Sequence, residues 1–490
     1  MPKQEDLSKM KIVFINPCLG GDFSALDIAI TSLAAYINKK TMHNAEIIDL
    51  TFHRRGWREF LKRKIKEKMP DAIGISCSTM YMQYVKEIMK EVKNNLNCPI
   101  ILGGYHPSLY PDNTLRIPEC NAVCIGDGEK PLNQYLDNLS TGRSLEGITG
   151  IWSKENGRVI KNPIGYFYEN LNDLPAPDWS LWEDLDKYFY HLGMLYFIGS
   201  RGCPYQCSFC DAHGIANAVR GQYFRMRNPR DYVHEIVLQW EKYKDRDFRL
   251  AQLFDPVFSI DSEWVDAFCN EYKALELYKK LKFSVFSRID HLDEHKIKTL
   301  AEAGCGVIRV GVESGDQFMR SEIYKKKISD EIIRKVFRLL REAGIATTAY
   351  YMLGGPGESR NTIKKTIDFS WELDGERSVF FIYKPFTQEG IKQVYDYGGK
   401  IDNKRWQKAD NITFNAVIYT RDLSPGQVER YQVKAYLFTF FRRWFKILRR
   451  QKYRYFVYLF TYLLRGIKDG LNLIYLFTYF HVYGYDNIDK

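Results

Sequence analysis

The sequence predicts an α/β protein: an N-terminal Rossmann-like, doubly wound parallel sheet, then a partial (β/α)6 barrel, then a helical C-terminal tail. Short apolar runs alternate with helical patterns in two successive segments of the 490 residues, and this alternation stops near residue 424. Alternating strands and helices are typical of parallel sheets. A chain of this length also exceeds what one hydrophobic core organises.

We expect four regions along the chain. They are an α/β domain over 8–148, a hairpin and linker over 149–190, the barrel over 191–400 and the tail over 401–490. Hydrophobic residues make up 45% and charged residues 27%, values that are typical of a folded protein.

The first domain contains five short apolar runs, with helical patterns between them over Leu26–Asn38 and Met82–Asn95. Strands are predicted at Lys11–Pro17, Ala45–Leu50, Ala72–Cys77, Pro99–Gly104 and Ala122–Gly126. Ligands of doubly wound sheets bind beyond the carboxyl ends of the strands. Glycines and small polar residues follow several of these strands, and ordinary turn chemistry also accounts for many such glycines.

A hairpin and a linker are predicted next. Gly150–Asn162 contains Glu155-Asn156-Gly157, and Asn-Gly favours a tight hairpin turn. Asn172–Trp182 has two prolines and is typical of a linker.

The second alternating segment predicts six strands separated by helices such as Asp231–Tyr243, Glu294–Ala303 and Ile332–Ala343. The strands are expected at Tyr196–Gly202, Leu250–Phe258, Phe283–Asp290, Val307–Ser314, Thr347–Gly354 and Val379–Pro385. Functional residues of such barrels lie at the carboxyl ends of the strands.

The tail is basic and aromatic. The net charge is +11, and Arg430–Lys468 holds eleven Lys or Arg and no acid. Its uncharged runs, Tyr455–Leu464 and Gly470–Tyr485, are shorter than the roughly 20 residues of a membrane span. We therefore weigh two alternatives: a helical cap packed on the barrel, or peripheral contact with a membrane or lipid.

The chain start and the cysteine content predict a reducing location. The first seventeen residues contain no apolar leader segment, so we expect a cytoplasmic protein, with peripheral membrane contact as the alternative. Ten cysteines in 490 residues is not the density of a disulfide scaffold.

Three cysteines form the decisive motif. Cys203, Cys207 and Cys210 lie within eight residues, directly after a predicted strand. Closed zinc sites use four ligands, and the other cysteines outside this motif do not form a second Cys-x-x-Cys pair. Three thiolates on a four-iron cluster would leave one iron open for a substrate. Zinc binding, or three unrelated buried thiols, stay open as alternatives.

This Cys-x3-Cys-x2-Cys loop resembles the signature of the radical S-adenosylmethionine (SAM) superfamily. The order of the predicted domains, and the linker Leu174–Trp179, resemble its cobalamin-binding branch. That branch includes methylases and the anaerobic magnesium-protoporphyrin ester cyclases. The resemblance implies that Cys203, Cys207 and Cys210 hold a catalytic [4Fe–4S] cluster. In the family, the open iron binds SAM, and reductive cleavage of SAM produces a 5′-deoxyadenosyl radical.

The resemblance also implies SAM-binding residues near the strand ends. They are Phe209, Asp255, Ser287, Arg288, Glu313 and Gly355. Phe209 and Gly355 match positions near the adenine, and Asp255 one near the methionyl ammonium. Ser287, Arg288 and Glu313 match positions near the carboxylate and ribose, although an ordinary ion pair is an alternative for the last two.

Cobalamin is implied by the same resemblance, at the strand ends of the first domain. The matching residues are Ser76, Thr79, Gly103, Gly104, Gly126, Asp127, Gly128 and Glu129. The Asp-x-His-x-x-Gly motif of many B12 proteins is not present. His106 is either a cobalt ligand or an ordinary loop histidine, and a domain that has lost cobalamin binding remains an alternative.

Three functions compete at this level. The first is cobalamin-dependent radical methylation of an unreactive carbon, the second a cyclisation or rearrangement of the porphyrin-cyclase type. The third is a non-catalytic Fe–S or corrinoid sensor. We expect a small-molecule, peptide or lipid substrate and a flavodoxin or ferredoxin as electron donor, whereas no recognised nucleic-acid motif accompanies the basic tail.

Overall fold

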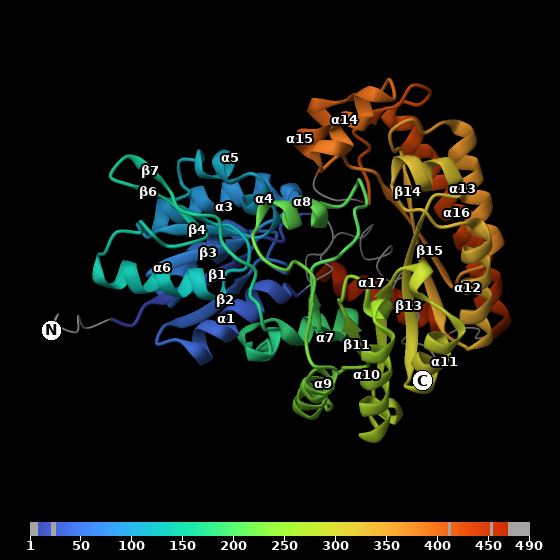
Figure 1. The fold of residues 1–490 in the computed structure, drawn as a ribbon, viewed down its shortest axis with the longest axis horizontal. Coiled ribbons are helices and arrows are strands. Elements are labelled where there is room, and N and C mark those ends of the chain that lie inside the picture. The colour runs from blue at the N-terminus through green and yellow to red at the C-terminus, as the bar shows by residue number, and fades with distance from the viewer. Residues whose placement is uncertain (1–7, 21–25, 410–412, 451–453, 469–490) are drawn as a thin grey trace. The chain divides into compact units, whose positions relative to one another are not determined.

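The computed structural model describes residues 8–20, 26–409, 413–450 and 454–468. Two compact units are present (Figure 1). The first is built mainly from the residues up to Lys187 together with 212–225, and the second mainly from 188–211 and 226–467. Short helices α7 (Leu185–Leu192) and α8 (Asp211–Ala218) lie where the chain passes between the units.

The first unit is a doubly wound sheet in the order β2-β1-β3-β4-β5-β6-β7. Strands β1 to β5 are parallel, which confirms the predicted fold class. The strands are β1 (Lys11–Asn16), β2 (Asn44–Asp49), β3 (Ala72–Ser76), β4 (Ile100–Gly103), β5 (Ala122–Cys124), β6 (Ile151–Glu155) and β7 (Arg158–Lys161). The helices are α1 (Ile28–Lys40), α2 (Trp57–Lys68), α3 (Met82–Asn95), α4 (Tyr105–Leu109), α5 (Pro111–Leu115) and α6 (Glu129–Thr141).

The core of this unit follows from the apolar strands. Val13 and Ile15 of β1 pack in one cluster with Leu61 and Ile65 of α2 and with residues of α3. Helix α1 packs against α6. Because a parallel sheet is covered by its crossover helices, its strands are apolar almost throughout.

The predicted hairpin is present and extends the sheet. Asn156 and Gly157 both have positive φ, 49° and 77°, as a two-residue type I′ turn requires. Strand β6 pairs antiparallel with β5, and β7 with β6.

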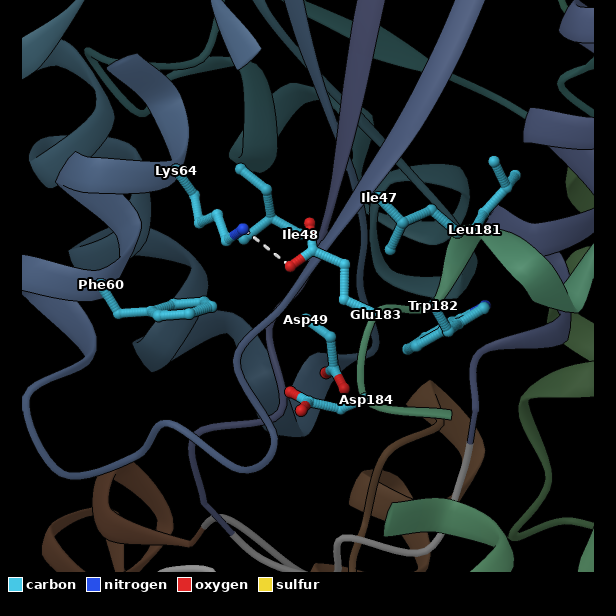
Figure 2. Close-up of a pocket in the computed structure, with 9 residues that line it drawn as sticks. All are labelled: Ile47, Ile48, Asp49, Phe60, Lys64, Leu181, Trp182, Glu183 and Asp184. Atoms are coloured by element: carbon cyan, nitrogen blue, oxygen red, sulfur yellow. Dashed lines mark ion pairs between the residues drawn. The ribbon is translucent and has the colours of Figure 1, made fainter. Parts of the chain in front are cut away.

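The predicted linker folds onto the first unit. Trp182 Nε1 donates to Thr31 Oγ1 at 2.9 Å, and Glu183 forms a 2.7 Å ion pair with Lys64. Figure 2 shows this ion pair beside a small cavity that Asp184 also lines. The cavity has room for about 10 Å³ of solvent, roughly one water molecule. It is too small for any cofactor that the sequence implies.

The second unit contains a six-stranded parallel sheet in the order β15-β14-β13-β12-β11-β8, as expected for a partial barrel. Its strands are β8 (Met194–Phe197), β11 (Leu250–Leu253), β12 (Lys282–Ser287), β13 (Cys305–Glu313), β14 (Ala346–Leu353) and β15 (Arg377–Ile382). Its helices include α9 (Pro229–Tyr243), α10 (Ser262–Ala274), α11 (Glu294–Glu302), α12 (Asp330–Glu342), α13 (Arg360–Leu373), α14 (Gln388–Asp396) and α15 (Asn403–Lys408). Two-residue strands lie at β9 (Ser200–Arg201), β10 (Arg225–Met226), β16 (Lys400–Ile401) and β17 (Ile418–Tyr419).

Four barrel strands end three to five residues earlier than the sequence predicted, at Phe197, Leu253, Ser287 and Ile382. The run Tyr196–Gly202 leaves the sheet after Phe197, since the Asp255 carboxylate binds the Gly199 amide. The runs that begin at Leu250 and Phe283 end early because short 3-10 helices follow them, over Phe258–Ile260 and Ile289–His291.

The tail is helical and packs on the barrel through its first helix. Helix α16 (Pro425–Arg450) contacts β15, where Gln432 Nε2 donates to the Phe380 carbonyl at 2.6 Å. Helix α17 (Arg454–Lys468) follows and contains the uncharged run Tyr455–Leu464. Within the described ranges, no helix is both long enough and apolar enough to cross a bilayer. The run Gly470–Tyr485 lies outside the described residues.

Candidate active site

The cysteine loop follows the end of β8 and β9. Cys203, Cys207 and Cys210 are half-buried and form no disulfide, and the Cys210 amide donates to the Cys207 carbonyl at 3.1 Å. In the described part of the chain, no three such ligands converge on a single metal ion. A four-iron cluster presents a separate iron to each thiolate. Three thiols on one short loop are a ligand set that such a cluster could use.

A segment after β13 contacts this loop through hydrogen bonds and one aromatic pair. Ser208 Oγ donates to the Ile323 carbonyl at 2.5 Å, and its amide donates to Tyr324 O at 3.3 Å. The Phe209 ring meets Tyr324 edge-on, with ring centres 5.6 Å apart. Thr387 Oγ1, beyond β15, donates to Ser208 O at 2.6 Å. The loop is thus held by residues that are distant in sequence, which sequence analysis missed for want of a local signal.

Arg288 lies beside the cysteine loop. Its Nη1 is 3.6 Å from Cys207 Sγ, and its Cζ is 3.7 Å from the Tyr205 ring centre. Nε and Nη2 bind Asp290 at 3.0 and 2.8 Å. Arg288 therefore bridges an acid and a thiol, and the ion-pair alternative describes part of its environment.

Glu313 is paired with Lys326. Lys326 Nζ lies 2.8 Å from Glu313 Oε1 and also donates to the Gly311 carbonyl at 2.7 Å. Glu313 has a φ of 68°, and the ladder between β13 and β14 is irregular there. A Cβ on Gly311 would lie 1.8 Å from Glu313 Oε1, so only glycine lets this carboxylate fold back over the strand. Lys326 was not predicted, because it lies in a lysine run that is typical of a surface.

These cations act on the thiols. Burial raises the pKa of Cys203 and Cys207, and the positive charges of Arg288 and Lys326 oppose that rise. Since the thiolate is the metal-binding form, the cations favour cluster binding.

Asp255 has partners other than the methionyl ammonium that was expected. The carboxyl is 1% exposed and accepts hydrogen bonds from Gly199 N at 2.9 Å, Ser200 Oγ at 2.6 Å and Tyr232 Oη at 3.0 Å. Burial raises its pKa to about 6 against these hydrogen bonds. Asp255 therefore anchors the residues that lead into the cysteine loop.

Ser287 and Gly355 lie in different surroundings. Ser287 Oγ is hydrogen-bonded to Ser259 Oγ. A Cβ on Gly355 would lie 2.3 Å from Tyr324 Oη, the same tyrosine that Phe209 contacts. The structure thus brings Phe209 and Gly355 together around Tyr324.

The first unit has a polar edge where β3 and β4 end. Ser76 and Gly103 are in register, and Thr79 Oγ1 is 3.0 Å from His106 Nδ1. Ser78 Oγ is buried with no hydrogen-bond partner among the described residues. An unsatisfied buried hydroxyl suits a polar group of a ligand such as cobalamin.

The other predicted cobalamin residues lie around the end of β5. Gly126 has a φ of 91°, and Asp127 Oδ2 accepts from Arg225 Nη1 at 2.7 Å and from the Tyr168 amide at 2.9 Å. Asp127 thus holds the Arg225 side chain and the Tyr168 backbone in place. Gly128 and Glu129 begin α6, and Glu129 is 2% exposed.

Gly104→Ala is expected to lower stability and corrinoid retention. Gly104 has φ 95° and ψ −164°, and an added Cβ would lie 2.9 Å from Cys77 O. We expect a loss of about 2 kcal/mol and displacement of the polar edge. Gly142→Ala is the control, since Gly142 also has positive φ but nothing within 4 Å. Thermal unfolding and bound corrinoid after desalting measure the effect; equal corrinoid retention by the two variants would contradict it.

A thiol loop at the end of a parallel barrel strand, beside buried cations, defines an iron–sulfur enzyme. The profile of the radical SAM superfamily matches residues 197–370, and that of the B12 binding domain matches residues 16–136. The chain thus contains a radical SAM domain over residues 197–370 and a B12-binding domain before it, over residues 16–136. Its cofactors are accordingly a [4Fe–4S] cluster, SAM and cobalamin.

Several relatives are also radical SAM or cobalamin-dependent enzymes by name, or methyltransferases. An uncharacterised methyltransferase of Pyrococcus horikoshii is 25% identical, over 95% of this chain and 96% of its own. The anaerobic magnesium-protoporphyrin IX monomethyl ester cyclase of Cereibacter sphaeroides is also 25% identical, over 69% of this chain and 56% of its own. The radical SAM methyltransferase TsrM of Kitasatospora setae shares the fold, with a TM-score of 0.67 and 20% identity over 86% of this chain and 83% of its own.

Proposed function

We propose that this chain is a cobalamin-dependent radical SAM methyltransferase that methylates an unreactive carbon of a small molecule. The observation that carries the proposal is the loop of Cys203, Cys207 and Cys210, with Arg288 and Lys326 beside it, in a chain that also has a B12-binding domain. When bound, the cluster supplies reductive cleavage of SAM and cobalamin supplies methyl transfer.

The residues of the second unit have distinct roles in this proposal. The three cysteines bind the cluster, and the two cations offset its negative charge. Phe209 and Gly355, joined by Tyr324, offer an aromatic and backbone surface for adenine. Asp255 positions the entry to the cysteine loop through its hydrogen bonds to Gly199 and Ser200.

In the first unit, we propose that cobalamin binds along the polar edge. Ser76, Ser78, Thr79, Gly103 and Gly104 lie together there, and Ser78 provides the unsatisfied hydroxyl. His106 binds Thr79, and burial lowers its pKa to about 4, so the imidazole is neutral near pH 7.

The relatives support methylation over other outcomes. The Pyrococcus horikoshii methyltransferase matches nearly the whole chain, and the TsrM methyltransferase structure contains a tryptophan substrate. The cyclase relatives favour cyclisation as the second candidate. The electron is proposed to come from a flavodoxin or ferredoxin in a reducing cytoplasm, which agrees with the lack of a disulfide among the ten cysteines, all of them in the described ranges.

Anaerobic reconstitution distinguishes these functions. We expect about four irons and one corrinoid per chain and, with SAM and a reductant, both 5′-deoxyadenosine and S-adenosylhomocysteine. The first product reports radical formation and the second reports methyl transfer. Mass spectrometry measures both products. 5′-Deoxyadenosine alone would favour the cyclase candidate, and neither product from cluster-loaded protein would contradict both candidates.

A further inference from the structure

One face of the barrel sheet carries a row of aromatic side chains. Ring centres are 4.8, 5.3, 6.3 and 5.5 Å apart along it. The aromatic row consists of Tyr196 on β8, Phe254 directly after β11, Phe286 on β12, Tyr350 on β14 and Phe381 on β15. The last two contacts are stacked, with ring planes 16° and 9° apart.

The two faces of the same strands differ in burial. On the opposite face, Phe283 packs against Tyr272 of α10 and Phe380 against Tyr436 of α16, and both phenylalanines are 0% exposed. In the aromatic row, Phe254, Phe286, Tyr350 and Phe381 are all half-buried. Helices thus bury these aromatics of the opposite face, whereas four rings of the row keep part of their surface exposed and the fifth, Tyr196, is 2% exposed.

Strand β13 contributes a glycine to the row. Gly311 is in register with Tyr350, on the strand that lies between those of Phe286 and Tyr350. The carboxylate of Glu313 and the Nζ of Lys326 lie over the same glycine. The row thus adjoins the ion pair whose charges act on Cys207.

A positive charge lies beside the row. Arg309 is 0% exposed, its Cζ is 5.9 Å from the Phe286 ring centre, and its Nε donates to Gln252 Oε1 at 2.8 Å. A guanidinium in this surrounding of low dielectric attracts an anionic substituent and repels a cationic one.

We propose that the aromatic row binds the substrate, and that the substrate is a planar conjugated ring system with an anionic substituent. The inference rests on the proposed function and names its substrate class. Offset stacking on Phe286, Tyr350 and Phe381 would hold the ring, and Arg309 would select the anionic substituent. The partial exposure of Phe286, Tyr350 and Phe381 leaves ring surface that a flat ligand could cover.

Two probe acids of similar size test the proposal on the full chain with cluster and cobalamin bound. They are naphthalene-2-carboxylate, which is planar and conjugated, and decahydronaphthalene-2-carboxylate, which is saturated. We expect calorimetry to show the planar acid binding at least tenfold more tightly. Phe286→Leu and Tyr350→Leu keep apolar volume and should each reduce this preference about two- to tenfold. Tyr395→Leu, at a 57% exposed position on α14, should leave it unchanged.

The outcomes separate this inference from the proposed function. Equal binding of both acids, binding of neither, or a preference that both row variants retain would overturn the aromatic row as substrate site. Each variant is also assayed for 5′-deoxyadenosine formation and for folding by circular dichroism. If either row variant misfolds, the difference in affinity of the wild-type chain for the two acids still tests whether the site prefers a planar ring. Wild-type chain that binds the planar acid but releases no 5′-deoxyadenosine would contradict the proposed function and leave the row standing.

Discussion

Replacing Cys207 with alanine is expected to remove the iron–sulfur cluster. Cys207 is the central thiol of the loop, and Arg288 Nη1 lies 3.6 Å from its sulfur. A methyl group cannot ligate iron, so two thiolates would remain for a cluster that needs three. We expect the broad visible absorbance of the reconstituted chain to disappear. Formation of 5′-deoxyadenosine should fall more than roughly 100-fold, since even outer-shell changes at metal sites cost 10–100-fold.

Cys269→Ala is the matched control for this experiment. Cys269 is a free thiol in the same unit, 0% exposed on α10, and burial raises its pKa to about 12. An inert buried thiol of this kind contributes packing rather than a ligand. The control should keep its absorbance and its SAM cleavage. A Cys207→Ala protein with the same iron content as this control would refute the cluster assignment.

Asp255→Ala is expected to have the next largest effect, on stability and on cluster uptake together. The substitution leaves the Gly199 amide and the Ser200 and Tyr232 hydroxyls without their acceptor. Buried donors that lose an acceptor cost about 1–3 kcal/mol each, so a loss of about 3 kcal/mol is expected. Urea unfolding measures the stability, and iron content measures the cluster. Because Ser200 precedes Cys203 by three residues, the loop should also bind iron less completely.

Asp255→Asn separates the hydrogen bonds from the charge. Its amide oxygen can still accept from Gly199 and Ser200, so most of the stability should return. The wild-type carboxyl has a pKa of about 6, raised by burial from 3.8. Between these pH values the carboxyl binds more protons in the folded than in the unfolded chain, so raising the pH from 4 to 6 lowers the free energy of unfolding by roughly 2 kcal/mol. The Asn variant should lack this pH dependence. If the free energy of unfolding changed equally with pH in the wild type and in the Asn variant, Asp255 would not titrate in this way.

Much of the fold could be predicted because its strands are short apolar runs bounded by turn residues. The predicted run Ala72–Cys77 and the observed strand Ala72–Ser76 differ by one residue, and the helix Met82–Asn95 was predicted with the observed bounds. The errors fall at the barrel strand ends. Phe197 and Leu253 end their strands early because Asp255 and a 3-10 turn intervene, and neither interaction has a local pattern.

The candidate site divides in the same way. The spacing of Cys203, Cys207 and Cys210 is a local property, since one short loop must present all three thiols. The partners of that loop are not local: Ile323, Tyr324 and Thr387 reach it from beyond β13 and β15. Lys326 lies in a run of lysines that predicts a solvated surface, yet it is 5% exposed and paired with Glu313.

By itself, the sequence determined the order of the domains, the class of cofactor chemistry and the loop that carries the thiols. These features depend on periodicity and on motif spacing. Both are patterns among residues that are close together in the chain. Only the tertiary structure decided that Asp255 anchors the cysteine loop and that five aromatic residues form one row. Such contacts join strands that are far apart in sequence, and their geometry exists only once the sheet has set the register between them.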